Sequence, residues 1–392
     1  MTERTYLDYN ATAPVRSEVR EVMASALLNA GNASSVHAEG RRARALIETA
    51  REQVAGLAGA DPANVIFTSG GTEANVTALA PENAGTCGAP EMEPVCIISA
   101  VEHPSVLAGG RFRTQDLQRV PVTSAGTIDQ SALSTAVADH SASRPGAPLL
   151  ASVMVANNET GAVQPVAEVA RIVHDHGGVV HADAVQAAGK LMLDIGALGV
   201  DLMSLSAHKI GGPQGVGALV LGGDGSGLRH PLIGGGGQEQ RRRAGTENVA
   251  GIVGFGIAAE LVRRDLPRMQ ALASRRDDME SRLSEVAPEL VVFARETERL
   301  PNTSCIAVPD TRAETIVIAL DLAGVAVSAG SACTSGKVQR SHVLEAMGVS
   351  PDLAGAAIRI SLGWETTADD VARFVAAWSR VYAELTGRRD AA

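Results

Sequence analysis

The chain has 392 residues, of which 45% are hydrophobic, 20% charged and 3% aromatic, and its formal net charge at pH 7 is −10. This composition is typical of a globular protein, and the length allows one large domain with a smaller one. The negative charge and the few aromatic side chains argue against a nucleic-acid partner. No apolar run reaches about 18 residues, the length that a membrane span needs, and the first residues do not resemble a signal peptide.

The four cysteines are Cys87, Cys96, Cys305 and Cys333. No two of them form a CxxC pair, so neither a zinc ribbon nor a disulfide framework is predicted. Cys96 and Cys305 lie in apolar, strand-like runs, and Cys87 lies in a segment rich in glycine and proline. These cysteines suit a reducing compartment, and we expect a cytoplasmic protein.

Between about residues 15 and 250, short apolar runs alternate with segments of helical periodicity. This alternation predicts βα units on a mostly parallel sheet, and the almost continuous apolar strands predict that both sheet faces are covered. The expected helices include Ala132–Ala138 and Val166–His176. The expected strands are Val65–Thr68, Val95–Ser99, Leu149–Val155, Val179–Ala182, Leu202–Ser206 and Val216–Leu221.

The composition changes after the four glycines at 234–237. A charged helical region over about Val249–Val286 is expected to connect to a smaller α+β domain, whose last helix opens with the capping pattern Thr367-Ala368-Asp369-Asp370. We therefore expect a large domain over residues 15–255 and a small domain formed by residues 1–14 and 256–392. The expected elements of the second region are strands Thr303–Val308, Val325–Ser328 and Ile358–Leu362 and helices Glu314–Ala323 and Thr367–Leu385.

Two strand ends in the first region carry residues suited to an anionic or flat ligand. The segment Thr68-Ser69-Gly70-Gly71-Thr72 follows a strand and opens a helix, where free N–H groups can bind a phosphate. An ordinary strand-to-helix turn has the same appearance. His103 follows the next strand and precedes a proline, so it can either stack on a heteroaromatic ring or serve as a surface or capping residue.

Two further strand ends carry amides and a carboxylate. Asn157 either shapes a turn or contacts a ligand, and Asn158 can donate to a ring oxygen or to a substrate carboxylate. Asp183 lies at the end of the following strand, with Gln186 shortly after it. A buried carboxylate is costly unless a cation faces it, so Asp183 either partners a pyridinium nitrogen or is a solvated loop residue.

Lys209 ends the next apolar strand segment, in Ser206-Ala207-His208-Lys209, and a glycine-rich turn follows it. A lysine buried there has a lowered pKa, which suits imine formation and proton transfer. A random lysine is far more often a surface residue. Five strand ends in succession carry polar groups that a cofactor can use. Together with Lys209, this combination favours pyridoxal phosphate chemistry.

At these residues the chain resembles the class V, fold type I pyridoxal phosphate enzymes. The resemblance covers nearly the whole chain and includes Asp8-Tyr9-Asn10-Ala11-Thr12, Glu102-His103, Asn157-Asn158-Glu159, His181-Ala182-Asp183 and Ser206-Ala207-His208-Lys209. Within that group, Arg243-Ala244-Gly245-Thr246 and Ser331-Ala332-Cys333-Thr334 resemble the cysteine desulfurases, in particular the nitrogen-fixation and iron–sulfur-assembly branch. The second motif is specific, because a general aminotransferase has no use for a cysteine there.

The resemblance implies a fold with a seven-stranded, mostly parallel sheet, and it implies the site residues. Lys209 forms the Schiff base and then moves the Cα proton, while His103 stacks on the ring and assists proton transfer. Asp183, Asn158 and Gln186 contact the ring, and Arg359, Asn158 and Asn10 contact the substrate. The phosphate contacts implied are Gly71, Thr72, Ser206, His208 and, from a neighbouring subunit, Thr246.

The same resemblance implies that Cys333 is the nucleophile that attacks the sulfur of L-cysteine and holds it as a persulfide. Its glycine-rich surroundings suit a segment that moves between the cofactor and an external acceptor. The implied partners are a second copy of the chain and a sulfur acceptor such as an iron–sulfur scaffold, to whose nascent cluster Cys333 is a transient ligand through the persulfide. A selenocysteine lyase, an aminotransferase or a sulfur-delivery protein with a degenerate site are the alternatives.

Overall fold

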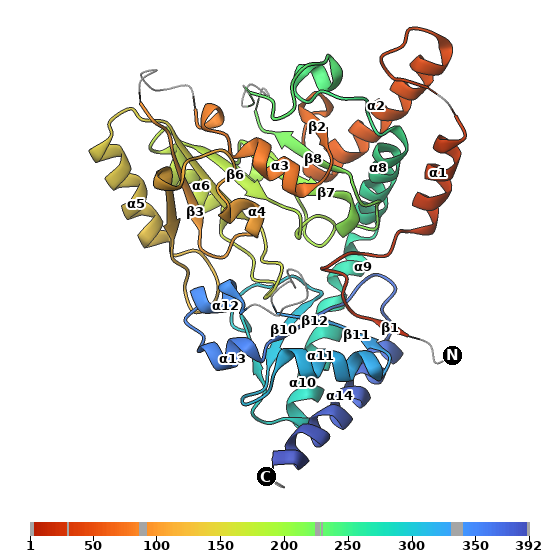
Figure 1. Ribbon diagram of the computed structural model, residues 1–392, viewed down its shortest axis with the longest axis vertical. Helices are drawn as coiled ribbons and strands as arrows, with labels where there is room; N and C mark the ends of the chain where they lie inside the picture. The colour runs from red at the N-terminus through yellow and green to blue at the C-terminus, as the bar shows by residue number, and fades with distance from the viewer. Residues whose placement is uncertain are drawn as a thin grey trace.

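The computed structural model describes residues 4–29, 31–85, 92–223, 228, 230–330 and 340–389. Its largest sheet has seven strands in the order β2-β8-β7-β6-β5-β3-β4 (Figure 1). Six strands run parallel to one another, and β8 runs antiparallel to both of its neighbours, which confirms the mostly parallel sheet. The strands are β2 (Val65–Thr68), β3 (Val95–Ser99), β4 (Leu117–Val120), β5 (Leu149–Met154), β6 (Val179–Asp183), β7 (Leu202–Ser206) and β8 (Gly217–Leu221).

Alternate residues of these strands enter two different cores, because successive side chains of a strand point to opposite faces. Phe67 and Ile97 pack in one core, whereas their neighbours Ile66 and Ile98 pack in the other. Both faces are therefore covered, as the apolar strands predict. Helices α1 (Ser17–Leu27), α2 (Ala38–Ala58), α5 (Gln130–Ser143), α6 (Val166–His174), α7 (Ile195–Leu198) and α8 (Val249–Arg264) cover the first face, and α3 (Gly71–Ala78) and α4 (Pro104–Leu107) the second.

A second, antiparallel sheet lies in the lower half of Figure 1, with the strand order β12-β13-β10-β9. Its strands are β9 (Val291–Val292), β10 (Thr303–Ala307), β12 (Ser328–Ala329) and β13 (Ile358–Ser361). Helices α10 (Leu272–Val286), α11 (Ala313–Leu322) and α14 (Ala368–Arg389) share one core with it, and α12 (His342–Ala346) and α13 (Pro351–Gly355) share another.

The N-terminal segment returns to this second region. Strand β1 (Thr5–Tyr6) pairs in parallel with β11 (Val325–Ala326), beside the C-terminal helices in Figure 1. The residues that follow β1 therefore run between the two sheets. The remaining helical turns are α9 (Leu266–Gln270), η1 (Pro62–Asn64), η2 (Pro81–Asn83), η3 (Thr114–Asp116), η4 (Ala207–Lys209) and η5 (Gln238–Arg241).

Two expected elements differ in the structure. The region Val249–Val286 is three helices, α8, α9 and α10, because Pro267 lacks the N–H that a continuous helix needs and instead starts a new one. The run Val325–Ser328 is split between β11 and β12, which belong to different sheets.

The capping pattern of the last helix is confirmed, since the Thr367 amide donates to Asp370 at 2.8 Å and the Asp370 amide donates back to Thr367 at 3.1 Å. The division into domains at residues 14/15 and 255/256 stays a prediction, and α8 continues across residue 255. Within the described ranges, no helix is both long and apolar enough to cross a bilayer.

Candidate active site

A cavity of about 700 Å³ lies where the carboxyl ends of β3, β5, β6 and β7 face β12 and β13. Binding pockets for small molecules are commonly of this size, and this edge of a parallel sheet is where they form. The cavity gathers every predicted cofactor and substrate residue that the structure describes, except Thr246. They are Asn10, Gly71, Thr72, His103, Asn158, Asp183, Gln186, Ser206, His208, Lys209 and Arg359.

Lys209 is the last residue of η4, directly after β7, as expected for the lysine of this site. Its amine donates to the main-chain oxygen of Asn10 at 2.6 Å and to that of Ala11 at 2.9 Å. Burial, with the nearby Arg359 guanidinium, lowers the pKa of Lys209 to about 8. An amine of this pKa is neutral in a useful fraction near neutral pH, so Lys209 can act as a nucleophile and as a base.

Asp183 ends β6, the strand next to β7, and only 6% of it is exposed. Its carboxylate accepts from the Asn75 side chain at 2.8 Å and from the Val185 amide at 3.0 Å. The structure therefore rules out the solvated-loop interpretation. Two neutral donors do not balance a buried charge, so a cationic group in the cavity suits Asp183.

Three of the predicted phosphate contacts lie together at the start of helix α3. Gly71 and Thr72 are its first two residues, and Ser206 ends the strand beside it. A side chain at Gly71 would lie 2.8 Å from Val185 and 3.4 Å from Ser206, so only glycine fits here without displacing Val185. The free N–H groups and the dipole of the helix start then suit an anion.

His208 lies at the same end of the cavity and bonds to the Thr12 hydroxyl at 3.3 Å. Burial lowers the pKa of His208 to about 4, and Lys209 and Lys190 contribute. Its imidazole is therefore neutral at physiological pH.

His103 caps helix α4, with its Nδ1 atom 2.7 Å from the Ser105 hydroxyl and 3.1 Å from the Ser105 amide that donates to it. The capping interpretation is thus correct, yet the same ring lines the cavity. Desolvation lowers the pKa of His103, Lys209 and His342 contribute, and Asp183 opposes them. A neutral ring in this place can stack on a flat ligand and exchange a proton.

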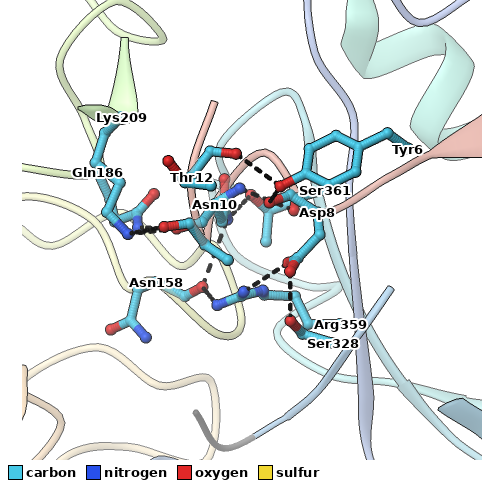
Figure 2. A network of polar contacts seen from close by, with 12 residues as sticks. Tyr6, Asp8, Asn10, Thr12, Asn158, Gln186, Lys209, Ser328, Arg359 and Ser361 are labelled. Carbon is cyan, nitrogen blue, oxygen red and sulfur yellow. Dashed lines mark hydrogen bonds and ion pairs between the residues drawn. The ribbon is translucent and has the colours of Figure 1, made fainter. Parts of the chain in front are cut away.

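Arg359 enters the cavity from β13 of the second sheet. Its guanidinium donates to the Asp8 carboxylate at 2.9 Å and to the main-chain oxygen of Asn158 at 2.9 Å (Figure 2). Its Nε–H is buried and has no partner among the described residues. The guanidinium lines the cavity, so Arg359 is suited to a ligand carboxylate.

Asn10 joins the two halves of the site, as Figure 2 shows. Its main-chain oxygen accepts from both Lys209 and Gln186. Its side chain donates to Thr303 at 2.8 Å and accepts from Asn302 at 3.1 Å. Asn10 therefore lies where predicted, but its amide holds the architecture together and is already engaged.

Two residues of the site escaped the sequence analysis. Asn75 lies one helical turn after Gly71 on α3, and this spacing is a signal for a shared face. Asp8 accepts from Arg359 and, at 2.7 Å, from Ser328. No local pattern reveals the Asp8–Arg359 pair, because 351 residues separate its members.

Two predicted residues are not brought into this arrangement. Cys333 lies outside the described residues. Thr246 is exposed and does not line the cavity, so the structure of one chain does not test its expected role at a neighbouring subunit. The other cysteines predicted to be structural, Cys96 and Cys305, are buried in β3 and β10.

The residues present fit pyridoxal phosphate. The start of α3 at Gly71 and Thr72, which lines the cavity, suits its phosphate, and the buried Asp183 suits its ring nitrogen. Lys209 supplies the amine that its aldehyde needs, and the Arg359 guanidinium, which lines the cavity, suits an amino acid carboxylate.

Comparisons with known proteins agree with this fit. The family model described as Aminotransferase class-V matches residues 5–374. A cysteine desulfurase of Sinorhizobium fredii is 42% identical over 377 residues, which cover 94% of each chain. The cysteine desulfurase IscS of Dictyoglomus turgidum is 41% identical over 382 residues, which cover 95% of this chain and 92% of the relative.

Solved structures are similar over the same length. A NifS-like protein from Rickettsia africae superimposes with a TM-score of 0.84 at 33% identity, covering 97% of this chain and 99% of that chain. A structure described as SspA in complex with cysteine superimposes with a TM-score of 0.74 at 29% identity, covering 91% and 98%. The chain belongs to the class V aminotransferase family and, within it, to the cysteine desulfurases.

Proposed function

We propose that this protein converts L-cysteine to L-alanine with pyridoxal 5′-phosphate and holds the removed sulfur as a persulfide on Cys333. The observation that carries the proposal is the cavity that joins Lys209, Asp183 and Arg359. An amine with a pKa of about 8, a buried carboxylate and a guanidinium that lines the cavity are the three groups that the cofactor and an amino acid substrate require. The cysteine in the complex of the relative SspA supports this substrate.

When bound, the cofactor supplies an electron sink that weakens the bonds at the substrate Cα. The protein supplies the groups that orient the cofactor. Gly71 and Thr72 bind the phosphate through the start of α3, with Ser206 and His208 beside them, and Asp183 holds the proton of the ring nitrogen. Asn75 fixes Asp183 in this role through its 2.8 Å hydrogen bond.

Lys209 is the base that takes the proton from the substrate Cα. Its low pKa lets it be neutral before the transfer and protonated afterwards. His103, whose ring is also neutral, stacks on the cofactor and assists proton transfer. Arg359, whose guanidinium lines the cavity, binds the substrate carboxylate, while Asp8 and the main-chain oxygen of Asn158 hold the guanidinium in place.

Cys333 acts as the nucleophile. Its thiolate forms an S–S bond to the substrate sulfur while the Cβ–S bond breaks. Cβ then gains a proton, equivalent to the one lost by the enzyme thiol, and Cα regains the proton that Lys209 took, which gives alanine. The balance is one cysteine and one enzyme thiol giving one alanine and one enzyme persulfide. The persulfide then passes to an acceptor protein, for which an iron–sulfur scaffold is our proposal, consistent with the IscS name of a relative.

We further propose that the enzyme acts in the cytoplasm as a homodimer. Thr246 supports the dimer, because it is exposed and outside the cavity of its own chain. Its expected phosphate contact then lies in the cavity of the neighbouring subunit.

The replacement Cys333→Ser tests the nucleophile. We expect the variant to keep the visible absorption of bound cofactor and to lose the release of alanine from cysteine. Cys87→Ser is the matched control and is expected to retain both. Alanine release by Cys333→Ser at the original rate would contradict the proposal. Amino transfer to a keto acid, or a preference for selenocysteine, would instead favour one of the alternative enzymes.

A further inference from the structure

Lysine is rare in this protein. Of its 34 lysine and arginine residues, only three are lysines: Lys190, Lys209 and Lys337. Arginine is always charged, whereas lysine can lose its proton when buried. Lysines retained in such a chain therefore point to places that need a neutral amine. Lys190 and Lys209 both belong to the described part, and both line a small cavity of about 10 Å³ behind the active site, enough for a single water.

Lys190 has no place in the mechanism described so far. It is 3% exposed, and the charged groups that act on it, Lys209 and Arg359, are both cations. Burial first, and then these two cations, place the pKa of Lys190 well below its usual value. The Lys190 amine therefore loses its proton more readily than an exposed lysine does.

The chain turns so that Lys190 contacts Gln186. Gly189 has a φ of +70°, and a side chain there would lie 2.8 Å from Val262 of α8. Glycine therefore permits this tight turn against the helix. It brings the Lys190 amine to 2.7 Å from the Gln186 side-chain oxygen.

The two ends of the Gln186 amide are thereby distinguished. Its Nε2 atom donates to the main-chain oxygen of Asn10 at 2.9 Å, and a carbonyl can only accept. Its oxygen must then face Lys190, which donates to it. Rotating the amide by half a turn would place oxygen against oxygen at Asn10, so both contacts favour one orientation.

We propose that Lys190 is a positioning residue that fixes the Gln186 amide with its oxygen turned toward Lys190, which does not line the active-site cavity, and its nitrogen turned toward Asn10. One N–H of Gln186 bonds to Asn10, and the second is left for the cavity that Gln186 lines. A donor there attracts the anionic ring oxygen of the cofactor, whereas an acceptor would repel it. The attraction of the ring oxygen rests on the proposed function, whereas the orientation of the Gln186 amide rests on the contacts alone.

A double-mutant cycle on the holoenzyme tests the proposal, with wild type, Lys190→Met, Gln186→Met and the double variant. Methionine keeps an unbranched chain without the amine. We expect Lys190→Met to raise the Kd for pyridoxal phosphate by about fivefold or more and to shift the pH midpoint of the visible absorption of the bound cofactor. In the Gln186→Met background, the same replacement should change neither.

A purely structural lysine would give a different result. Its loss would weaken the cofactor equally in both backgrounds, and this outcome overturns the proposal. An unchanged Kd and an unchanged pH midpoint for Lys190→Met in the Gln186 background also overturn it.

Melting temperatures give a second measurement that does not depend on the cofactor. In Gln186→Glu, we expect Lys190 to pair with the new carboxylate, so that adding Lys190→Met lowers the Tm by several degrees. In Gln186→Met, the addition should lower it much less. An equal decrease of the Tm in both backgrounds would exclude the contact between Lys190 and residue 186. An enzyme that binds no pyridoxal phosphate would overturn the proposed function, and the difference in Tm would still decide the contact.

Discussion

Two opposing effects act on the Lys209 amine. Its hydrogen bonds to the main-chain oxygens of Asn10 and Ala11 favour the charged form, whereas burial and Arg359 favour the neutral form. The balance lies at a pKa of about 8, so about a tenth of the amine is neutral at pH 7. Most of the Lys209 amine is therefore an ammonium ion that gives up its proton easily.

The rate at which the apoprotein captures pyridoxal phosphate should report this pKa. Because only the neutral amine attacks an aldehyde, we expect the rate to rise with pH up to about pH 8 and then to level off. Stopped-flow absorption measurements across the pH range give the midpoint. A midpoint near the ordinary lysine pKa of about 10.4 would contradict the environment described here.

The replacement Arg359→Met is the matched variant for this measurement. It removes the nearest cation that lowers the pKa of Lys209 and leaves Asp8, whose charge raises it. We therefore expect the midpoint of capture to move to higher pH in Arg359→Met. A midpoint that stays unchanged or moves to lower pH would contradict this effect of the guanidinium on the amine.

At the scale of single elements, the start of helix α3 depends on Gly71, because a side chain at this position would not fit. Gly71 lies against Val185, two residues from Asp183, and against Ser206 of β7. A methyl group there would push on the two segments that carry the ring partner and a phosphate contact. Overpacking of this kind costs about 1–3 kcal/mol.

We expect Gly71→Ala to weaken pyridoxal phosphate binding by about tenfold, which corresponds to about 1.4 kcal/mol. The measurement is the Kd from titration of the visible absorption, with the Tm as a check on folding. Gly355→Ala in α13 is the control, because a side chain there would meet no atom within 4 Å. Equal affinities for the two variants would mean that the start of α3 does not bind the cofactor.

The elements that the sequence predicts well are those whose burial is uniform. Strands β2, β3 and β7 are buried along their whole length and match the expected bounds. Strand β4 was missed, because it pairs with β3 alone at the sheet edge and its Gln118 and Arg119 are exposed. An edge strand with polar residues has no periodicity that separates it from a loop.

The site residues also divide into those that the sequence predicts and those that it does not. The residues at strand ends were predicted because parallel strands bring their carboxyl ends to one edge, and this rule needs no contact map. Asp8 and Lys190 were not predicted, since their roles depend on which atoms they contact. The Asp8–Arg359 pair arises only after β1 has joined the second sheet region.

At the scale of the whole molecule, the active site joins segments from both ends of the chain. Residues after β1 cross between the two sheets, where Asn10 contacts Asn302, Thr303 and Ser361. Lys209 comes from the first sheet and Arg359 from the second. A movement of one sheet relative to the other would therefore change the distance between the groups that act on the cofactor and those that bind the substrate.

The expected contribution of Thr246 belongs to this scale, because it needs two chains. If Thr246 binds the phosphate of the neighbouring subunit, each active site combines Lys209 of one chain with Thr246 of the other. We expect Lys209→Ala to be inactive and Thr246→Ala to bind the cofactor about tenfold more weakly. In a mixed dimer of these two variants, one site carries both replacements and the other carries neither.

Mixing the two variants after dissociation should therefore restore activity, and at random pairing about a quarter of all sites become native. The measurement is alanine release at a cofactor concentration too low to saturate Thr246→Ala. Each variant dissociated and reassociated alone is the control and should stay at its own level. If Thr246 acts within its own chain, every site that keeps Lys209 also lacks Thr246, and mixing would only average the two activities.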